Sequence, residues 1–129
     1  MKIIYVERKF DLDERLINFA ASIMDMVENM PKSFAGKYVS EQIIRCGSAP
    51  ALQYAEAQSA ESPADFLHKM KVALKELRET YNCLRLINKK NWIAKEILNP
   101  LLDENNQLIA IFFKSIDTSK KNNSSKKVS

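Results

Sequence analysis

The sequence predicts an all-α protein, an antiparallel up-down-up-down four-helix bundle whose second helix is kinked near Pro50. Three observations support this fold class. Apolar residues recur at spacings of three and four along four segments, which is the period of one helix face. The chain has only two glycines and four prolines, too few for many tight β-turns. The connections between the four segments are short, which makes consecutive helices antiparallel neighbours.

The first helix is predicted from about Asp11 to Met30. Asp11 and Glu14 have the spacing of a capping box, and Pro31 disfavours helical geometry at the residue before it. The apolar face of this helix comprises Leu12, Leu16, Phe19, Ala20, Ile23, Val27 and Met30.

The second helix is predicted to start after Ser33. Its apolar residues are Phe34, Tyr38, Val39, Ile43, Ile44 and Cys46. Pro50 has no N–H to donate to the Cys46 carbonyl and its ring crowds that carbonyl, at a cost of about 3 kcal/mol. Because the apolar spacing resumes at Leu52, we favour one kinked helix over two separate helices.

The third helix is predicted from Pro63 to about Asn88, with Ser62 as N-cap and Asp65 in the first turn. Its apolar face comprises Phe66, Met70, Ala73, Leu74, Leu77, Tyr81, Leu84 and Ile87.

The last helix begins at Trp92 or at Asn99, and we prefer Asn99 because Asn is a good N-cap and Pro100 suits the first helical position. Its core stripe comprises Leu101, Leu102, Leu108, Ile109, Phe112 and Ile116.

A single domain accounts for the chain. A length of 129 residues, with 46% hydrophobic and 28% charged residues, is typical of one globular core. We expect residues 1–10 to form an N-terminal segment, residues 11–118 the bundle, and residues 119–129 a disordered tail of Lys, Ser and Asn.

The N-terminus lacks the apolar stretch of a secretory signal, and the longest apolar run, residues 108–113, is too short to cross a bilayer. We therefore expect a cytoplasmic protein with no membrane partner. Cys46 and Cys83 are expected to be reduced in that compartment.

Positive charge is unevenly distributed. The net charge of +4 equals the four tail lysines, Lys120, Lys121, Lys126 and Lys127, so the body of the chain is neutral. Within the third helix, however, Lys71, Lys75, Arg78, Arg85 and Lys89 fall on one stripe, followed by Lys90. Two interpretations remain: a surface that follows a nucleic-acid phosphate backbone, or a solvated face whose charges pair with Glu76, Glu79 or neighbouring helices.

Two further groups on these helices indicate assembly and internal pairing. Val72, Cys83 and Leu86 lie on a side of the third helix outside both its core and its basic stripe, which suggests a contact with a second subunit; scattered exposed side chains are the alternative. Arg45, Glu56, Glu76, Arg78 and Glu79 are candidates for a structural ion-pair network near the kink.

Catalytic and metal-binding patterns are sparse. His68 is the single histidine, so one chain cannot supply the paired Glu-x-x-His motifs of a di-iron bundle. Two cysteines without partner ligands do not make a zinc site, and no phosphate-binding loop or nucleophile elbow occurs. We expect no cofactor, no metal and no enzymatic activity, although a site formed between subunits stays an alternative.

Several segments resemble one known family across most of residues 10–120. They are Asp11-Leu12, the stretch from Arg45 to Ala57, Asp65-Phe66, the stretch from Lys75 to Glu79, and Lys114-Ser115-Ile116. The chain resembles the four-helix-bundle proteins encoded by intervening sequences of bacterial 23S ribosomal RNA genes. That resemblance implies a four-helix bundle assembled into a ring of five subunits. It also implies kinship with accessory proteins of diversity-generating retroelements, which bind nucleic acid and a reverse transcriptase.

The sequence therefore favours a non-enzymatic homo-oligomer, a pentamer by resemblance, that binds RNA or DNA through the basic stripe of the third helix. The alternative is a protein–protein interaction scaffold or accessory subunit that does not bind nucleic acid.

Overall fold

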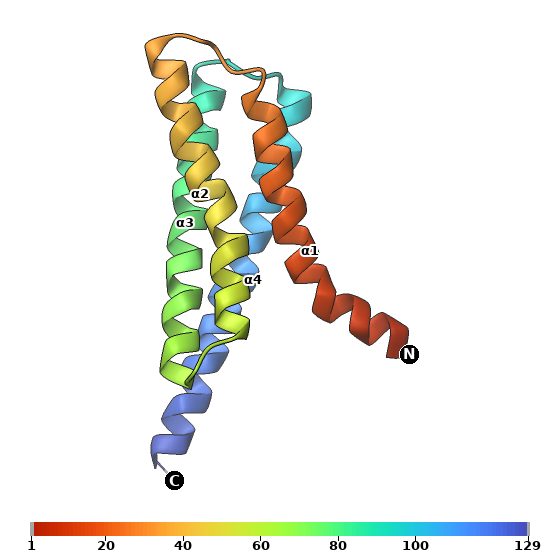
Figure 1. Cartoon of the computed structure of the whole chain (residues 1–129), viewed down its shortest axis with the longest axis vertical. Coiled ribbons are helices and arrows are strands. Elements are labelled where there is room, and N and C mark those ends of the chain that lie inside the picture. Colours follow the sequence, from red (N-terminus) through yellow and green to blue (C-terminus); the bar gives the residue numbers. More distant parts are fainter. Residues whose placement is uncertain (1, 129) are drawn as a thin grey trace.

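The chain folds into four α-helices, which confirms the predicted bundle (Figure 1). The structure, a computed structural model, describes the backbone of residues 2–128 and the side chains of residues 12–124. No strand occurs in residues 2–128. The helices are α1 (Lys2–Val27), α2 (Phe34–Gln58), α3 (Pro63–Lys89) and α4 (Lys95–Val128).

Figure 1 shows the connections at alternating ends of the bundle. The loops after α1 and after α3 lie at one end, and the loop between α2 and α3 lies at the other. Helix α3 packs against both α2 and α4, and α1 packs against α2 and α4. Because α3 packs extensively against two helices, only its remaining side is open to a ligand.

Serine residues cap α2 and α3: Ser62 is the predicted N-cap, and α2 starts after Ser33 as predicted, with Ser33 as its N-cap. The Ser33 hydroxyl accepts a hydrogen bond from the Gly36 amide at 3.2 Å, and the Ser62 hydroxyl accepts one from the Asp65 amide at 3.0 Å. Gly36 also allows a close approach, because a Cβ there would collide with the carbonyl oxygen of Pro31. The chain before α2 is therefore held against the first turn of the helix.

Helix α3 ends in a Schellman motif around Asn91, whose φ of 55° lies in the left-handed region. The Trp92 amide donates to the Ile87 carbonyl at 3.2 Å, and the Asn91 amide donates to the Asn88 carbonyl at 3.1 Å. These bonds satisfy carbonyls at the helix end and turn the chain towards α4.

Helix α2 is continuous through Pro50, so the prediction of one helix rather than two is correct. Pro50 is buried within it. Just before the proline, the Ser48 hydroxyl donates to the Ile44 carbonyl at 2.7 Å. The kink itself stays a prediction.

The preferred start of the last helix was wrong. Helix α4 begins at Lys95, and the Leu98 amide donates to the Ala94 carbonyl at 3.0 Å, so Pro100 lies inside the helix instead of at its first position. The turn before the proline carries Leu98, which is fully buried. Burying that side chain contributes about 1.5–3 kcal/mol, which offsets much of the cost of one proline inside a helix.

Both terminal boundaries proposed for the domain lie within helices. Helix α1 runs through Asp11, the expected N-cap, whose side chain lies outside the described residues. Helix α4 runs past Ser119, where the tail was expected to begin, to Val128. The division into segments 1–10, 11–118 and 119–129 stays a prediction. No helix in residues 2–128 is long and apolar enough to cross a membrane.

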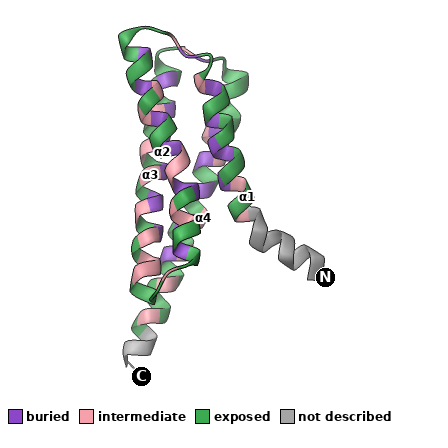
Figure 2. Ribbon diagram, viewed as in Figure 1, coloured by how far each residue is buried: buried purple, intermediate pink, exposed green. Residues whose placement is uncertain are grey.

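The core lies along the axis of the bundle, where the buried stripes of the four helices meet (Figure 2). The predicted apolar face of α3 is almost entirely buried, and Leu77, Leu84 and Ile87 are fully inaccessible. Helix α2 differs from the expectation: Phe34, Tyr38 and Ile44 are exposed by 93%, 60% and 37%. Phe34 and Tyr38 are four residues apart and lie together on the outer face of α2, whereas Ile44, six residues further along, lies on another exposed side.

One polar residue lies in the core. Asn105 of α4 is fully buried, and its Nδ2 donates to the Leu77 carbonyl of α3 at 3.1 Å. Its Oδ1 has no hydrogen-bond partner among the described residues. Asn105 thus links α3 to α4 at one register.

Candidate nucleic-acid interface

The predicted basic residues of α3 all reach solvent. Lys71, Lys75, Arg78, Arg85, Lys89 and Lys90 are exposed. The first five share a stripe of the helix with Asn82, because their spacings of three and four keep them on one face. Lys90, at the C-cap, instead lies over the ring of Trp92, 5.9 Å from its centroid. The structure therefore keeps five of the six residues on one line.

Part of this stripe forms one wall of a groove between α3 and α4. The groove has a volume of about 410 Å³ and is lined by four cations: Lys71, Lys75 and Arg78 of α3, and Lys120 of α4. The nearly buried Leu74 and Ile116 also line it. We call this feature the basic groove.

An aromatic side chain of α4 lines the same groove. Phe113 of α4 lines the basic groove and is 58% exposed. It lies one helical turn before Ile116 and two turns before Lys120, so these three residues share one side of α4. Sequence reasoning missed Phe113 and assigned Lys120 to the tail, because no pattern within α4 alone shows that this side meets the basic stripe of α3.

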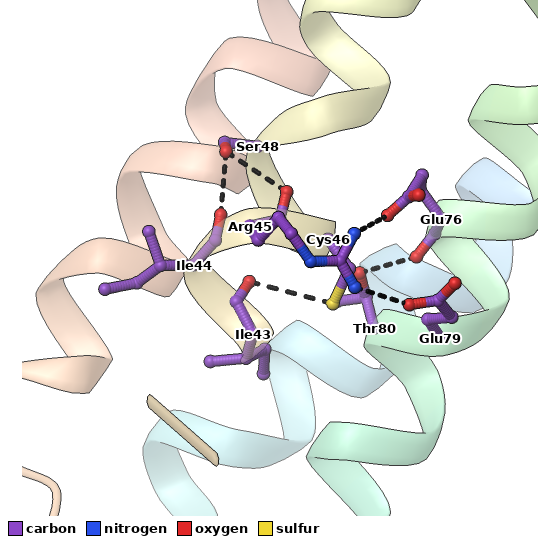
Figure 3. Close-up of polar contacts among 8 residues, drawn as sticks. All are labelled: Ile43, Ile44, Arg45, Cys46, Ser48, Glu76, Glu79 and Thr80. Carbon is purple, nitrogen blue, oxygen red and sulfur yellow. Dashed lines mark hydrogen bonds and ion pairs between the residues drawn. The ribbon is translucent and has the colours of Figure 1, made fainter. Parts of the chain in front are cut away.

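Acidic residues next to the stripe are occupied by a cation from another helix. Arg45 of α2 donates from Nη1 to Glu76 Oε2 at 3.0 Å and from Nη2 to Glu79 Oε2 at 2.8 Å (Figure 3). The hydrogen bond to Glu79 and the charge of Glu76 raise the pKa of Arg45 above its usual value. The two glutamates are therefore bound to α2 and leave the cations of the stripe available.

The cations of the groove have no ion-pair partner among the described side chains. The ion pairs of the described residues are formed by cations outside the groove: Arg15 with Glu104, Arg45 with Glu76 and Glu79, Lys69 with Glu56, and Lys121 with Asp117. Further along the stripe, Arg85 donates to the side chain of Asn82 at 3.2 Å. Four positive charges therefore surround the basic groove, with one carboxylate, Glu79, at its edge.

The predicted ion-pair network is divided in two. Arg45, Glu76 and Glu79 come together, but Glu56 binds Lys69 of α3 instead, at 2.6 Å. That contact raises the pKa of Lys69. Arg78 takes part in neither group within residues 12–124. The two groups both link α2 to α3, at separate points along the helices.

The strip predicted for subunit contact is partly buried within the chain, and the contact itself stays a prediction. Cys83 is half-buried and packs against the core, Val72 is half-buried, and Leu86 is 54% exposed. Cys83 interacts with Cys46 of α2. It lies on the side of α3 that faces α2, the side on which Glu76 and Glu79 bind Arg45. The more exposed apolar residues lie on α2, where Phe34, Tyr38 and Leu52 are exposed by 93%, 60% and 63%.

Cys46 and Cys83 are free thiols that influence each other across the α2–α3 contact. The hydrogen bond between them, followed by one from Thr80, lowers the pKa of Cys46. The same contact and burial raise the pKa of Cys83. The buried Cys46 thiol also donates to the Ile43 carbonyl at 3.9 Å. These thiols belong to the packing between helices and lie apart from the basic groove.

No cluster of three or more His, Cys, Asp or Glu side chains suited to a metal ion occurs within the part of the chain that the structure describes. His68 is exposed on the first turns of α3.

Comparison with known proteins identifies the family. The family described as 23S rRNA-intervening sequence protein matches residues 8–114. A crystal structure from Bacteroides thetaiotaomicron, of a protein with unknown function from the S23 ribosomal protein family, has a similar fold with a TM-score of 0.74. The two are 28% identical, and the alignment covers 81% of this chain and 97% of that chain. No curated protein matches the chain. Because the family match spans most of the sequence, the chain belongs to the 23S rRNA-intervening sequence proteins.

Proposed function

We propose that this protein is a non-enzymatic, self-associating bundle of the cytoplasm that binds RNA or DNA along the basic stripe of α3 and the basic groove. The observation that carries the proposal is the set of four cations around one groove, none with an ion-pair partner among the described residues. Phosphates are the ligands that such a set neutralises, with release of their counterions.

The charge of the surrounding surface supports this assignment. Glu76 and Glu79 are the acidic residues in the middle of α3, and Arg45 binds both. An approaching polyanion therefore meets cations first, and its repulsion from the two carboxylates is reduced by the guanidinium between them.

Salt-dependent binding tests the proposal. Labelled single- and double-stranded RNA and DNA are titrated with the wild type and with a Lys71→Ala/Lys75→Ala/Arg78→Ala variant at several salt concentrations. For a single strand, each phosphate contact contributes about 0.7 to the slope of log K against log salt. Loss of three contacts should therefore reduce the slope by about 2 and weaken binding at low salt.

A matched variant controls for net charge. Lys32→Ala/Lys37→Ala/Lys95→Ala removes the same charge from exposed positions outside the groove, and it should retain the wild-type slope. Equal losses in the two variants would show only general attraction. Absence of binding by the wild type at low salt would overturn the proposal.

Self-association is proposed through the outer face of α2, in rings of five subunits by resemblance to the family. Phe34, Tyr38 and Leu52 repeat along this helix and are exposed by more than half, and covering such apolar area drives association. Light scattering should give a mass of several subunits for the wild type and a lower mass for Leu52→Glu. A monomeric wild type would refute this part.

The same face also supports the second candidate, a protein-interaction scaffold. If the wild type binds no nucleic acid but Leu52→Glu abolishes capture of a protein partner, the scaffold is the better account.

A further inference from the structure

We infer that the basic groove takes single-stranded rather than double-stranded nucleic acid, with one base stacked on Phe113. This inference rests on the proposed function and specifies its ligand. It starts from the position of Phe113, which is 58% exposed and lines the same groove as Lys71, Lys75, Arg78 and Lys120.

A duplex does not use this combination of side chains. Its bases are stacked on one another, so it presents phosphates to the cations and leaves an aromatic ring without a partner. A single strand presents phosphates together with unstacked bases, and proteins bind such strands by combining a positively charged groove with aromatic rings. Cations and an exposed ring in one groove therefore match the single strand.

The walls of the groove suit a base as well as a phosphate. Leu74 and Ile116 line it beside Phe113, and both are at least nine-tenths buried. A base that lies on the ring would cover this apolar surface, and the phosphates of the strand would then lie beside the exposed ammonium and guanidinium groups. Asn82, also in the groove, adds an amide for the edge of a base.

The stripe continues beyond the groove and provides a track for the strand. Asn82 also belongs to a neighbouring hollow that is lined by Arg85 and Lys89. At 1.5 Å per residue, residues 71–89 extend about 27 Å along α3. At 3.4 Å per nucleotide, the rise of a fully stacked strand, this length holds at most roughly eight nucleotides. A strand with unstacked bases is longer per nucleotide, so fewer nucleotides cover the stripe, still within the range of known single-strand sites.

Titration of fluorescent oligouridylate of about eight nucleotides tests the inference, beside a duplex RNA and an abasic oligomer of the same length. The wild type should bind the oligouridylate more tightly than either. Phe113→Ala should weaken oligouridylate binding by about 5- to 150-fold, the loss expected for one stacked base, and should leave duplex and abasic binding within about twofold.

Further variants separate stacking from other roles of the ring. Phe113→Trp should retain the affinity and Phe113→Leu should lose it, because leucine keeps apolar area without an aromatic face. Ile17→Ala removes an exposed apolar side chain on α1, outside the groove and outside the proposed association face of α2, and should bind like the wild type.

Four outcomes would overturn the inference. Equal loss of single-strand and duplex binding in Phe113→Ala, or no loss at all, rejects base stacking while the proposed function stands. A change of oligomeric mass in Phe113→Ala shows that a second copy covers the ring. Absence of binding to every nucleic acid tested rejects the inference and the proposed function together.

Discussion

Replacement of the buried Asn105 by leucine should stabilise the bundle. In the native fold, Nδ2 makes one hydrogen bond, to the Leu77 carbonyl at 3.1 Å, and Oδ1 is buried without a partner among the described residues. An unpaired buried acceptor costs about 1–3 kcal/mol, whereas one neutral hydrogen bond contributes about 0.5–1.5 kcal/mol. The Leu77 carbonyl keeps its place in the α3 ladder. Asn105→Leu should therefore raise the free energy of unfolding by about 1–2 kcal/mol, since leucine has the same branching and the same number of side-chain heavy atoms as asparagine and needs only a small adjustment of the neighbouring side chains.

Urea denaturation at one fixed protein concentration measures this difference, because assembly also shifts apparent stability. Asn105→Ala should lose stability, since it leaves a cavity as well as removing the bond. Leucine at the exposed neighbour Asn106 should change the unfolding free energy by less than about 0.5 kcal/mol. If Asn105→Leu loses as much stability as Asn105→Ala, the amide is fully satisfied in the protein and the reasoning is refuted.

Three other variants test separate contacts. Gly36→Ala should lower the free energy of unfolding by about 1–3 kcal/mol, because its Cβ meets the Pro31 carbonyl oxygen; unchanged urea denaturation would contradict this. Arg45→Gln should weaken nucleic-acid binding severalfold at low salt and less at high salt, because two carboxylates beside the stripe lose their cation; fluorescence titration measures the effect, and equal affinities would contradict it. Cys83 has a raised pKa, through its contact with Cys46 and then burial. As pH rises through the ordinary thiol range, the unfolded chain loses this proton while the folded chain keeps it, so stability should fall. Cys83→Ala should flatten that fall in denaturation experiments across alkaline pH, and a slope equal to that of the wild type would contradict the assignment.

Much of the fold was predictable because its signals are local. The caps at Ser33 and Ser62 and the burial of Leu77 and Ile87 follow from side chains within one or two turns of each other. Helix spacing also placed the cations of α3 on one stripe.

Other features depend on contacts between helices and were not predictable in this way. Periodicity shows that Phe34 and Tyr38 lie on the same side of α2, but it does not show whether that side faces the core. The start of α4 was misjudged because the burial of Leu98 outweighs a local preference for Pro100 at a helix start.

The candidate site shows the same division. Its α3 half, including Lys71 and Arg78, was predicted from spacing, whereas Phe113 and Lys120 join it only because α4 packs beside α3. Glu56 was assigned to the Arg45 network, but the structure pairs it with a nearer lysine. Residue type indicated which groups can pair, and only the packing decided between the possible partners.

Because the basic groove lies between two helices, ligand binding in it is linked to the folding stability of the protein. The groove exists only while α3 and α4 lie against each other, so the unfolded chain has no equivalent binding site. A ligand at about 100 times its Kd then adds about 2.7 kcal/mol to the free energy of unfolding. Through this linkage the protein becomes more resistant to proteolysis when its ligand is abundant, because cleavage draws on transiently opened molecules.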